Sequence, residues 1–150
     1  MESLLEKIRY NVTVGISLLR KKNKNMKTAV VGSKTVTDFQ IIKDMIMKPI
    51  TLLNWKITEI VIGGVDYCDL GAALWARQNK VPIRIFSPNW KQWGRRAGFM
   101  RNIEMVNHAD AIIILCEEDK DVFHNLINLA REKKKQIFFY HLKEKYHENL

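Results

Sequence analysis

From about Met26 onward, short apolar runs alternate with longer segments in which apolar positions recur every three or four residues. The apolar runs predict buried strands and the periodic segments predict helices. The predicted strands are residues 28–32, 59–64, 81–86, 110–115 and 136–140. Strands separated by single helices indicate right-handed crossovers. We therefore expect an α/β protein, with a Rossmann-like parallel sheet of about five strands in the order 3-2-1-4-5 and helices on both faces.

Local signals place the ends of the predicted helices. Thr37, followed by Gln40 three positions later, has the form of a capping box, and the helix that it opens is expected to stop or bend at Pro49. Asp66 or Asp69 is expected to cap the next helix. Two more helices are expected over about 98–107 and 119–134.

A segment of different character precedes the first predicted strand. Apolar residues at roughly helical spacing predict an amphipathic helix over residues 3–20, followed by the basic connector RKKNKN at 20–25. We therefore expect an N-terminal extension at 1–25, a Rossmann-like domain at 26–142 and a polar tail at 143–150.

Composition and charge narrow the class of protein. No apolar run is long enough to span a membrane, the N-terminus lacks a signal-peptide pattern, and Cys68 and Cys116 lack metal-ligand spacing. We expect a cytoplasmic protein with two reduced, half-buried thiols and no membrane association. The net charge of +9 suggests an anionic partner, although a solvated Lys-rich surface gives the same number. The Lys-, Asn- and Ile-rich composition hints at an AT-rich bacterial or phage genome.

In parallel sheets ligands bind beyond the carboxyl ends of the strands, at the switch point between the first and fourth strands. Gly32, Ser33 and Lys34 follow the first strand, where backbone N–H groups, a hydroxyl and an ammonium group could contact an anion. As an alternative, this Gly-Ser turn only reverses the chain. After the second strand, Gly63 and Gly64 permit close backbone approach. Asp69, which follows them, is either a helix cap or a carboxylate near ribose hydroxyls, and the two roles are compatible.

The loop at 89–102 contains four cationic residues and no acid. Arginine supplies forked donors for phosphate, and an indole face can stack on a base. The candidate contacts are Trp90, Arg95, Arg96, Arg101 and Asn102. The competing interpretation is that the tryptophans anchor the loop to the core and the arginines are merely solvated.

These motifs resemble the YspA/YpsA-related branch of the SLOG superfamily, Rossmann-like proteins related to the LOG phosphoribohydrolases. The resemblance extends over about Met26 to Tyr140, and three signatures support it: Gly32-Ser33-Lys34, GGVDYCDLGAALWA (63–76) and NWKQWGRRAGFMRNIEM (89–105). Departures from the family pattern include Tyr67, which replaces a glycine, and Asn89, which replaces an aspartate. The resemblance implies a nucleotide-related ligand and a homo-oligomer, since relatives often dimerise.

The hydrolase relatives continue into Pro-Gly-Gly-x-Gly-Thr-x-x-Glu, whose glycine turn holds a phosphate and whose last Glu serves catalysis. Here the stretch reads CEEDKDVFH (116–124), with His124 at the position of that Glu. Carboxylates beside a phosphate oppose it, and a helix N-terminus offsets only part of the repulsion. We therefore expect no turnover of the relatives' kind and assign no catalytic residue.

The acidic turn after the fourth strand has three possible roles. Its carboxylates could stabilise a helix start, bind a divalent cation, or pair with the arginines of the loop at 89–102. The acids are Glu117, Glu118, Asp119 and Asp121.

The sequence thus supports three hypotheses about function. The first is a sensor or sequestering protein that binds a nucleotide or nucleotide-derived small molecule at the switch point, without turnover, metal or cofactor. The second is an enzyme of the phosphoribohydrolase type, in which Arg101 positions the anion and Asp69 or Glu117 acts as acid or base. The third is nucleic-acid binding through the basic connector and the Arg-rich loop.

Overall fold

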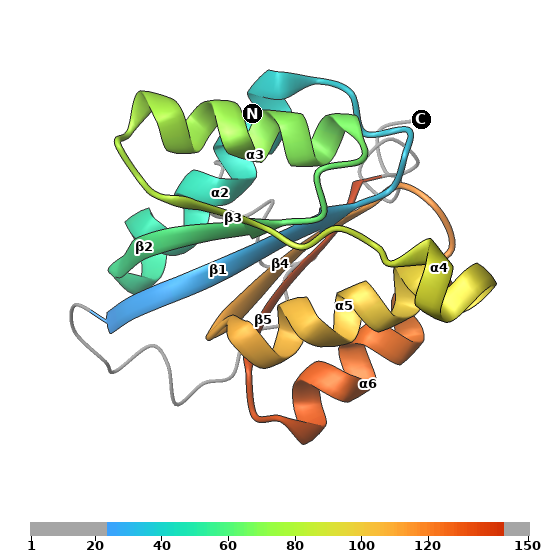
Figure 1. Cartoon of the computed structure of the whole chain (residues 1–150). Coiled ribbons are helices and arrows are strands. Elements are labelled where there is room, and N and C mark those ends of the chain that lie inside the picture. The colour runs from blue at the N-terminus through green and yellow to red at the C-terminus, as the bar shows by residue number, and fades with distance from the viewer. Residues whose placement is uncertain (1–23, 143–150) are drawn as a thin grey trace.

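The computed structural model describes residues 24–142 and contains one five-stranded parallel sheet. The strand order is β3-β2-β1-β4-β5, which confirms the predicted fold and order (Figure 1). The strands are β1 Lys24–Gly32, β2 Trp55–Ile62, β3 Ile83–Ile85, β4 Ala111–Cys116 and β5 Gln136–His141. The predicted N-terminal helix and the polar tail lie outside the described residues.

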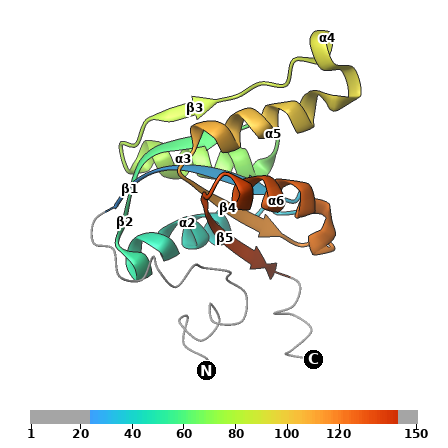
Figure 2. The same cartoon turned by 90° about the horizontal axis from the view of Figure 1, so that it is seen from below.

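The helices form one layer on each face of the sheet. α2 and α3 cover one face, and α5 and α6 cover the other (Figures 1 and 2). The α-helices are α2 Phe39–Leu53, α3 Tyr67–Gln78, α4 Trp90–Trp93, α5 Ala97–His108 and α6 His124–Glu132, and the 3₁₀ helices are η2 Gly94–Arg96 and η3 Lys120–Phe123. This layering follows from right-handed crossovers, which change face where the strand order reverses between β1 and β4.

The interior strand β4 is buried on both faces. All six of its residues are buried, and its side chains alternate between the two layers. Ile113 and Leu115 belong to the core beneath α2 and α3, whereas Ile112 and Ile114 belong to the core beneath α5 and α6. The continuous apolar run is therefore typical of a parallel strand covered by helices on both sides.

α2 does not stop at Pro49, one of the two outcomes predicted there, but continues and ends at Leu53. A proline inside a helix lacks the N–H that would bond to the carbonyl four residues earlier, here that of Met45. The Tyr140 hydroxyl of β5 lies 3.4 Å from the Met45 oxygen and donates to it. The tertiary structure thus supplies a partner for the acceptor that Pro49 leaves unpaired.

Several element boundaries also differ from the predictions. Asp38, rather than Thr37, caps α2, and its carboxylate accepts from the N–H groups of Gln40 and Ile41. The helix predicted over 119–134 is divided into η3 and the shorter α6. The short helices α4 and η2 were not predicted, because four-residue helices give almost no periodic signal.

Both cysteines are free thiols and are fully buried, not half-buried as predicted. Cys68 packs against Gly32 at the end of β1: a Cβ on Gly32 would lie 2.6 Å from the Cys68 Sγ and 3.3 Å from the Leu115 oxygen. The glycine of the first signature is therefore needed for the close approach of α3 to β1.

We predict that Gly32→Ala destabilises the protein, because the new methyl group would overlap both the thiol and a strand carbonyl. Overpacking of this kind costs about 1–3 kcal/mol of unfolding free energy. Urea denaturation measures the change, with Gly98→Ala as the matched control. A Cβ at Gly98 meets nothing within 4 Å, so that variant should be as stable as the parent or more so. Equal stability of both variants would contradict the packing argument.

Candidate functional site

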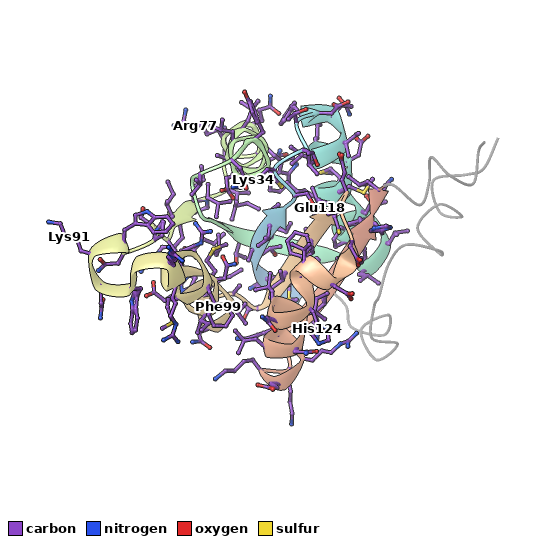
Figure 3. All side chains as sticks on the ribbon, turned by 90° about the vertical axis from the view of Figure 1, so that its right-hand side faces the viewer. Lys34, Arg77, Lys91, Phe99, Glu118 and His124 are labelled. Atoms are coloured by element: carbon purple, nitrogen blue, oxygen red, sulfur yellow. The ribbon has the colours of Figure 1, made fainter. Side chains whose placement is uncertain are left out.

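The turns after β1 and β4 are hydrogen-bonded to each other at the switch point. Ser33 N–H donates to the Leu115 oxygen at 2.9 Å, and Glu117 N–H donates to the Ser33 Oγ at 3.0 Å. Ser33 is buried, whereas Lys34 beside it is exposed, and Figure 3 shows Lys34 and Glu118 at this edge of the sheet. Ser33 thus joins the two turns, and the neighbouring Lys34 faces solvent.

The buried carboxylate of Asp69 organises the turn after β2. Its Oδ1 accepts from Gly63 N–H at 3.3 Å, and its Oδ2 accepts from Val65 N–H at 2.9 Å and from Asp66 N–H at 3.3 Å. This network holds the turn in which Gly64 has a φ of 73°. Asp69 therefore uses both carboxylate oxygens on the backbone.

Asp66 is the residue that caps α3. Its Oδ1 accepts from Asp69 N–H at 3.0 Å, and Asp69 returns a bond to the Asp66 N–H, which completes a capping box. Burial raises the pKa of the Asp66 carboxyl above its usual range, and the neighbouring Asp69 charge acts in the same direction, while Arg101 partly opposes the rise. Of the two predicted caps, Asp66 fills the position, and Asp69 is its reciprocal partner.

The Arg101 guanidinium lies directly against Gly63. A Cβ on Gly63 would lie 2.8 Å from the Arg101 Cζ, so only glycine leaves this space for the guanidinium. Arg101 Nε donates to the Asn102 Oδ1 at 2.9 Å, which fixes the plane of the group. Nη1 is shielded from solvent and has no hydrogen-bond partner among the described residues. The ends of β2 and α5 thus hold a preorganised donor without an acceptor.

The other residues predicted to contact a ligand lie on the short helices α4 and η2. Asn89 caps α4 by accepting from Gln92 N–H at 3.1 Å, and Trp90 is 62% exposed. Arg95 and Arg96 on η2 are also exposed, and Figures 1 and 2 place α4 at the outer end of the molecule, beyond the start of α5. Trp93 is half-buried. Trp90, Arg95 and Arg96 are thus exposed, whereas Arg101 is half-buried against Gly63.

The acidic turn after β4 includes a local cap. Asp119 accepts from Asp121 N–H at 3.1 Å and caps η3. Within residues 24–142, no ion pair joins this turn to an arginine, and no group of three or more His, Cys, Asp or Glu side chains could hold a metal ion. Of the three interpretations, helix capping is the one with a direct contact, and that contact comes from Asp119.

The Cys116 thiol and the Ser33 hydroxyl are hydrogen-bonded to the backbone of the acidic turn. Cys116 Sγ donates to the Glu118 oxygen at 3.1 Å, and Ser33 lies close to the same sulfur. Burial raises the pKa of the Cys116 thiol, and the Glu118 backbone and the Ser33 hydroxyl near the sulfur only partly oppose this rise. Cys116 is therefore a neutral packing residue at the switch point and not a nucleophile.

Sequence reasoning missed a hollow of about 220 Å³ between α5 and the η3–α6 segment. Its walls include Phe99, Asn102, Ile103, Phe123, Leu126 and Leu129. The sequence signal was weak, because these apolar positions also fit the buried faces of two packed helices. Asn102 lines this hollow while its side chain accepts from Arg101.

Asp69 and Asp66 provide a matched test of the turn. We predict that Asp69→Asn lowers the free energy of unfolding by about 1–3 kcal/mol, because an amide NH₂ would face backbone donors. Asp66→Asn keeps the capping oxygen and removes a carboxylate with a raised pKa, so at pH 7 this variant should be at least as stable as the parent. Urea denaturation at pH 7 compares the two variants, and equal losses would contradict the assigned roles.

The raised pKa of Asp66 also determines whether its contribution to folding stability rises or falls with pH. Folded Asp66 binds its proton more tightly than in the unfolded chain, so its contribution to stability falls as pH rises above about 4 towards its raised folded pKa. Asp66→Asn should flatten this part of the stability curve. An unchanged curve would contradict the burial of this carboxyl.

Among known proteins, one family matches part of this chain. The model of the YspA, cpYpsA-related SLOG family matches residues 26–93, which include the first two signatures and the beginning of the third. A crystal structure of a formyltetrahydrofolate deformylase from Pseudomonas putida KT2440 aligns at 19% identity with a TM-score of 0.32, over 59% of this chain and 29% of that chain. No significant match to a curated protein was found. The predicted resemblance is thereby confirmed: over residues 26–93, this chain matches the YspA, cpYpsA-related SLOG family.

Proposed function

We propose that the protein binds a nucleotide or a nucleotide-derived small molecule at the carboxyl edge of the sheet, as a sensor or sequestering protein without turnover. The observation that best supports this is the Arg101 guanidinium, held against Gly63 with Nη1 buried and unpartnered. A buried donor without an acceptor is costly, and a phosphate oxygen of a ligand would satisfy it. Family membership is consistent with a nucleotide-related ligand.

The neighbouring groups suit an anionic ligand on the β1 and β2 side of the switch point. Lys34 is exposed beside Ser33, and Gly64 exposes backbone after β2. Across the switch point, Glu117 and Glu118 would repel a phosphate. The anion would therefore lie against Arg101 and Lys34, and the predicted contacts of Trp90, Arg95 and Arg96 with the ligand remain a proposal.

Three features argue against hydrolysis. Asp69 uses both carboxylate oxygens to bind backbone N–H groups, so it is poorly placed as a general acid or base. His124, at the position of the relatives' catalytic Glu, is exposed on α6 and interacts with Asn128 at 3.0 Å. The glycine turn that would hold the phosphate is absent. These features support binding over the phosphoribohydrolase alternative.

The expected homo-oligomer remains a proposal as well. It is supported by exposed apolar residues on α3, where Leu70 is 66% exposed and Leu74 is 44% exposed.

Among the described residues, no helix is both long and apolar enough to cross a membrane.

Thermal denaturation against nucleosides and their mono-, di- and triphosphates tests the binding proposal. A ligand at 100 times its Kd stabilises the folded state by about 2.7 kcal/mol, which corresponds to a rise in Tm of about 10 °C. We expect such a rise for at least one phosphorylated ligand and none for the matching nucleoside. No response to any member of the panel would contradict the proposal.

Two variants test the role of Arg101 in that assay. Arg101→Met removes the guanidinium, and Gly63→Ala keeps it but displaces it. Each should weaken binding at least tenfold, because a charge-assisted hydrogen bond contributes about 1.5–3 kcal/mol. Gly98→Ala is the control and should bind as the parent does.

Chromatography of each bound nucleotide after long incubation tests turnover, since release of free base would establish the enzymatic alternative.

A further inference from the structure

The chain has two long segments with cations and no acid, and the second, between Asp69 and Glu104, lies wholly within the described residues. Between Asp69 and Glu104 there is no acidic residue, and the seven cationic residues there give a net charge of +7, compared with +9 for the whole chain. The seven are Arg77, Lys80, Arg84, Lys91, Arg95, Arg96 and Arg101. Arg101 belongs to the site already described, and the other six are exposed.

The fold places these six residues along one margin of the molecule, which we call the basic margin. They lie on the last turn of α3 and the turn after it, on the edge strand β3, and on α4 and η2. Figure 3 shows Arg77 and Lys91 on the side of the molecule formed by α3 and α4, away from Glu118.

The charges of the basic margin are not neutralised by the protein. The ion pair found within residues 24–142 joins His108 to Glu59, and none of the six cations has an acidic partner there. Arg84 lies over the Phe86 ring at 5.4 Å, a contact that leaves its charge uncompensated. The acidic turn lies across the switch point and would repel a polyanion. An anionic partner is therefore directed to the basic margin.

An aromatic side chain stands within this margin. Trp90 is the first residue of α4, its backbone is fixed by the Asn89 cap, and 62% of it remains exposed. Its neighbours Lys91, Arg95 and Arg96 have no hydrogen bond to the described part of the chain through their side chains. A solvent-exposed indole between cations is the combination with which proteins bind single strands, stacking on bases while cations contact phosphates.

We propose that the basic margin binds single-stranded nucleic acid, with Trp90 stacked on an exposed base and Arg95 and Arg96 on the adjacent phosphates. A duplex hides its base faces, so the exposed indole favours the single strand. This surface is distinct from the Arg101 site, and it needs neither the basic connector nor a bound small molecule.

Fluorescence anisotropy with labelled single-stranded DNA and RNA of about 12 nucleotides tests the proposal at low salt. We expect binding that weakens with salt, with a slope of log K against log salt of about −2 to −4. A duplex of the same length should bind more weakly. Comparison of the DNA and RNA arms identifies the preferred strand. No binding at low salt, or a duplex bound more tightly than either strand, would overturn the proposal.

Matched charge reversals test the location of the surface. Arg95→Glu/Arg96→Glu should weaken binding by tenfold or more and reduce the salt slope by about 1.4. Arg131→Glu/Lys133→Glu changes the net charge equally at the end of α6, and it should weaken binding far less. Equal losses in both variants would show a general effect of net charge and would overturn the assignment. Circular dichroism confirms that each variant is folded.

The stacking step has its own test. Trp90→Ala should weaken binding about tenfold and Trp90→Phe much less, because a phenyl ring still stacks. An acidic peptide such as polyglutamate, if bound as tightly as the oligonucleotide and unaffected by Trp90→Ala, would overturn the choice of partner. Excess nucleoside monophosphate should leave the oligonucleotide bound, and competition between them would place both ligands at one site and contradict a separate surface.

Discussion

The pairing of β1 with β4 is the constraint on which the rest of the structure depends. These strands are neighbours in the sheet although 78 residues separate their ends, from Gly32 to Ala111, and the chain leaves them on opposite faces. The helices α2 and α3 consequently lie on one face and α5 and α6 on the other, and the turns after both strands meet at one edge. Ser33 then fixes the distance between those turns through its hydrogen bonds to the β4 side.

The turns at this edge carry different side chains on the two sides of the β1–β4 pair. On the β2 side, a buried carboxylate shapes the turn that receives the Arg101 guanidinium. On the β4 side, the turn carries carboxylates, and one of them, Asp119, caps η3. The opposing charges are kept apart, since no ion pair joins them within the described part of the chain. The fold therefore presents an electrostatic gradient across the switch point, with an anion favoured on one side.

Much of the fold could be predicted from the sequence, because alternating strands and single helices leave few topologies for a parallel sheet. The details that failed depend on contacts between distant residues. α2 continues through Pro49 because Tyr140, on the far edge strand, satisfies the Met45 carbonyl. The turns of the candidate site were also found, but spacing could not reveal that Arg101 packs on Gly63 or that Asp69 is buried in its own turn. Which predicted residues contact a ligand stays a prediction.

The edge strand β3 has a consequence for solubility. It is three residues long, Pro82 precedes it, and Arg84 occupies its centre. If two copies aligned their β3 strands antiparallel, the Arg84 side chains would face each other, and like charges opposite one another destabilise a strand pair. A proline and a short length further limit the hydrogen bonds that an incoming strand could form. The chain can therefore leave this margin uncovered, with Ile85 56% exposed, without offering a template for edge-to-edge polymerisation.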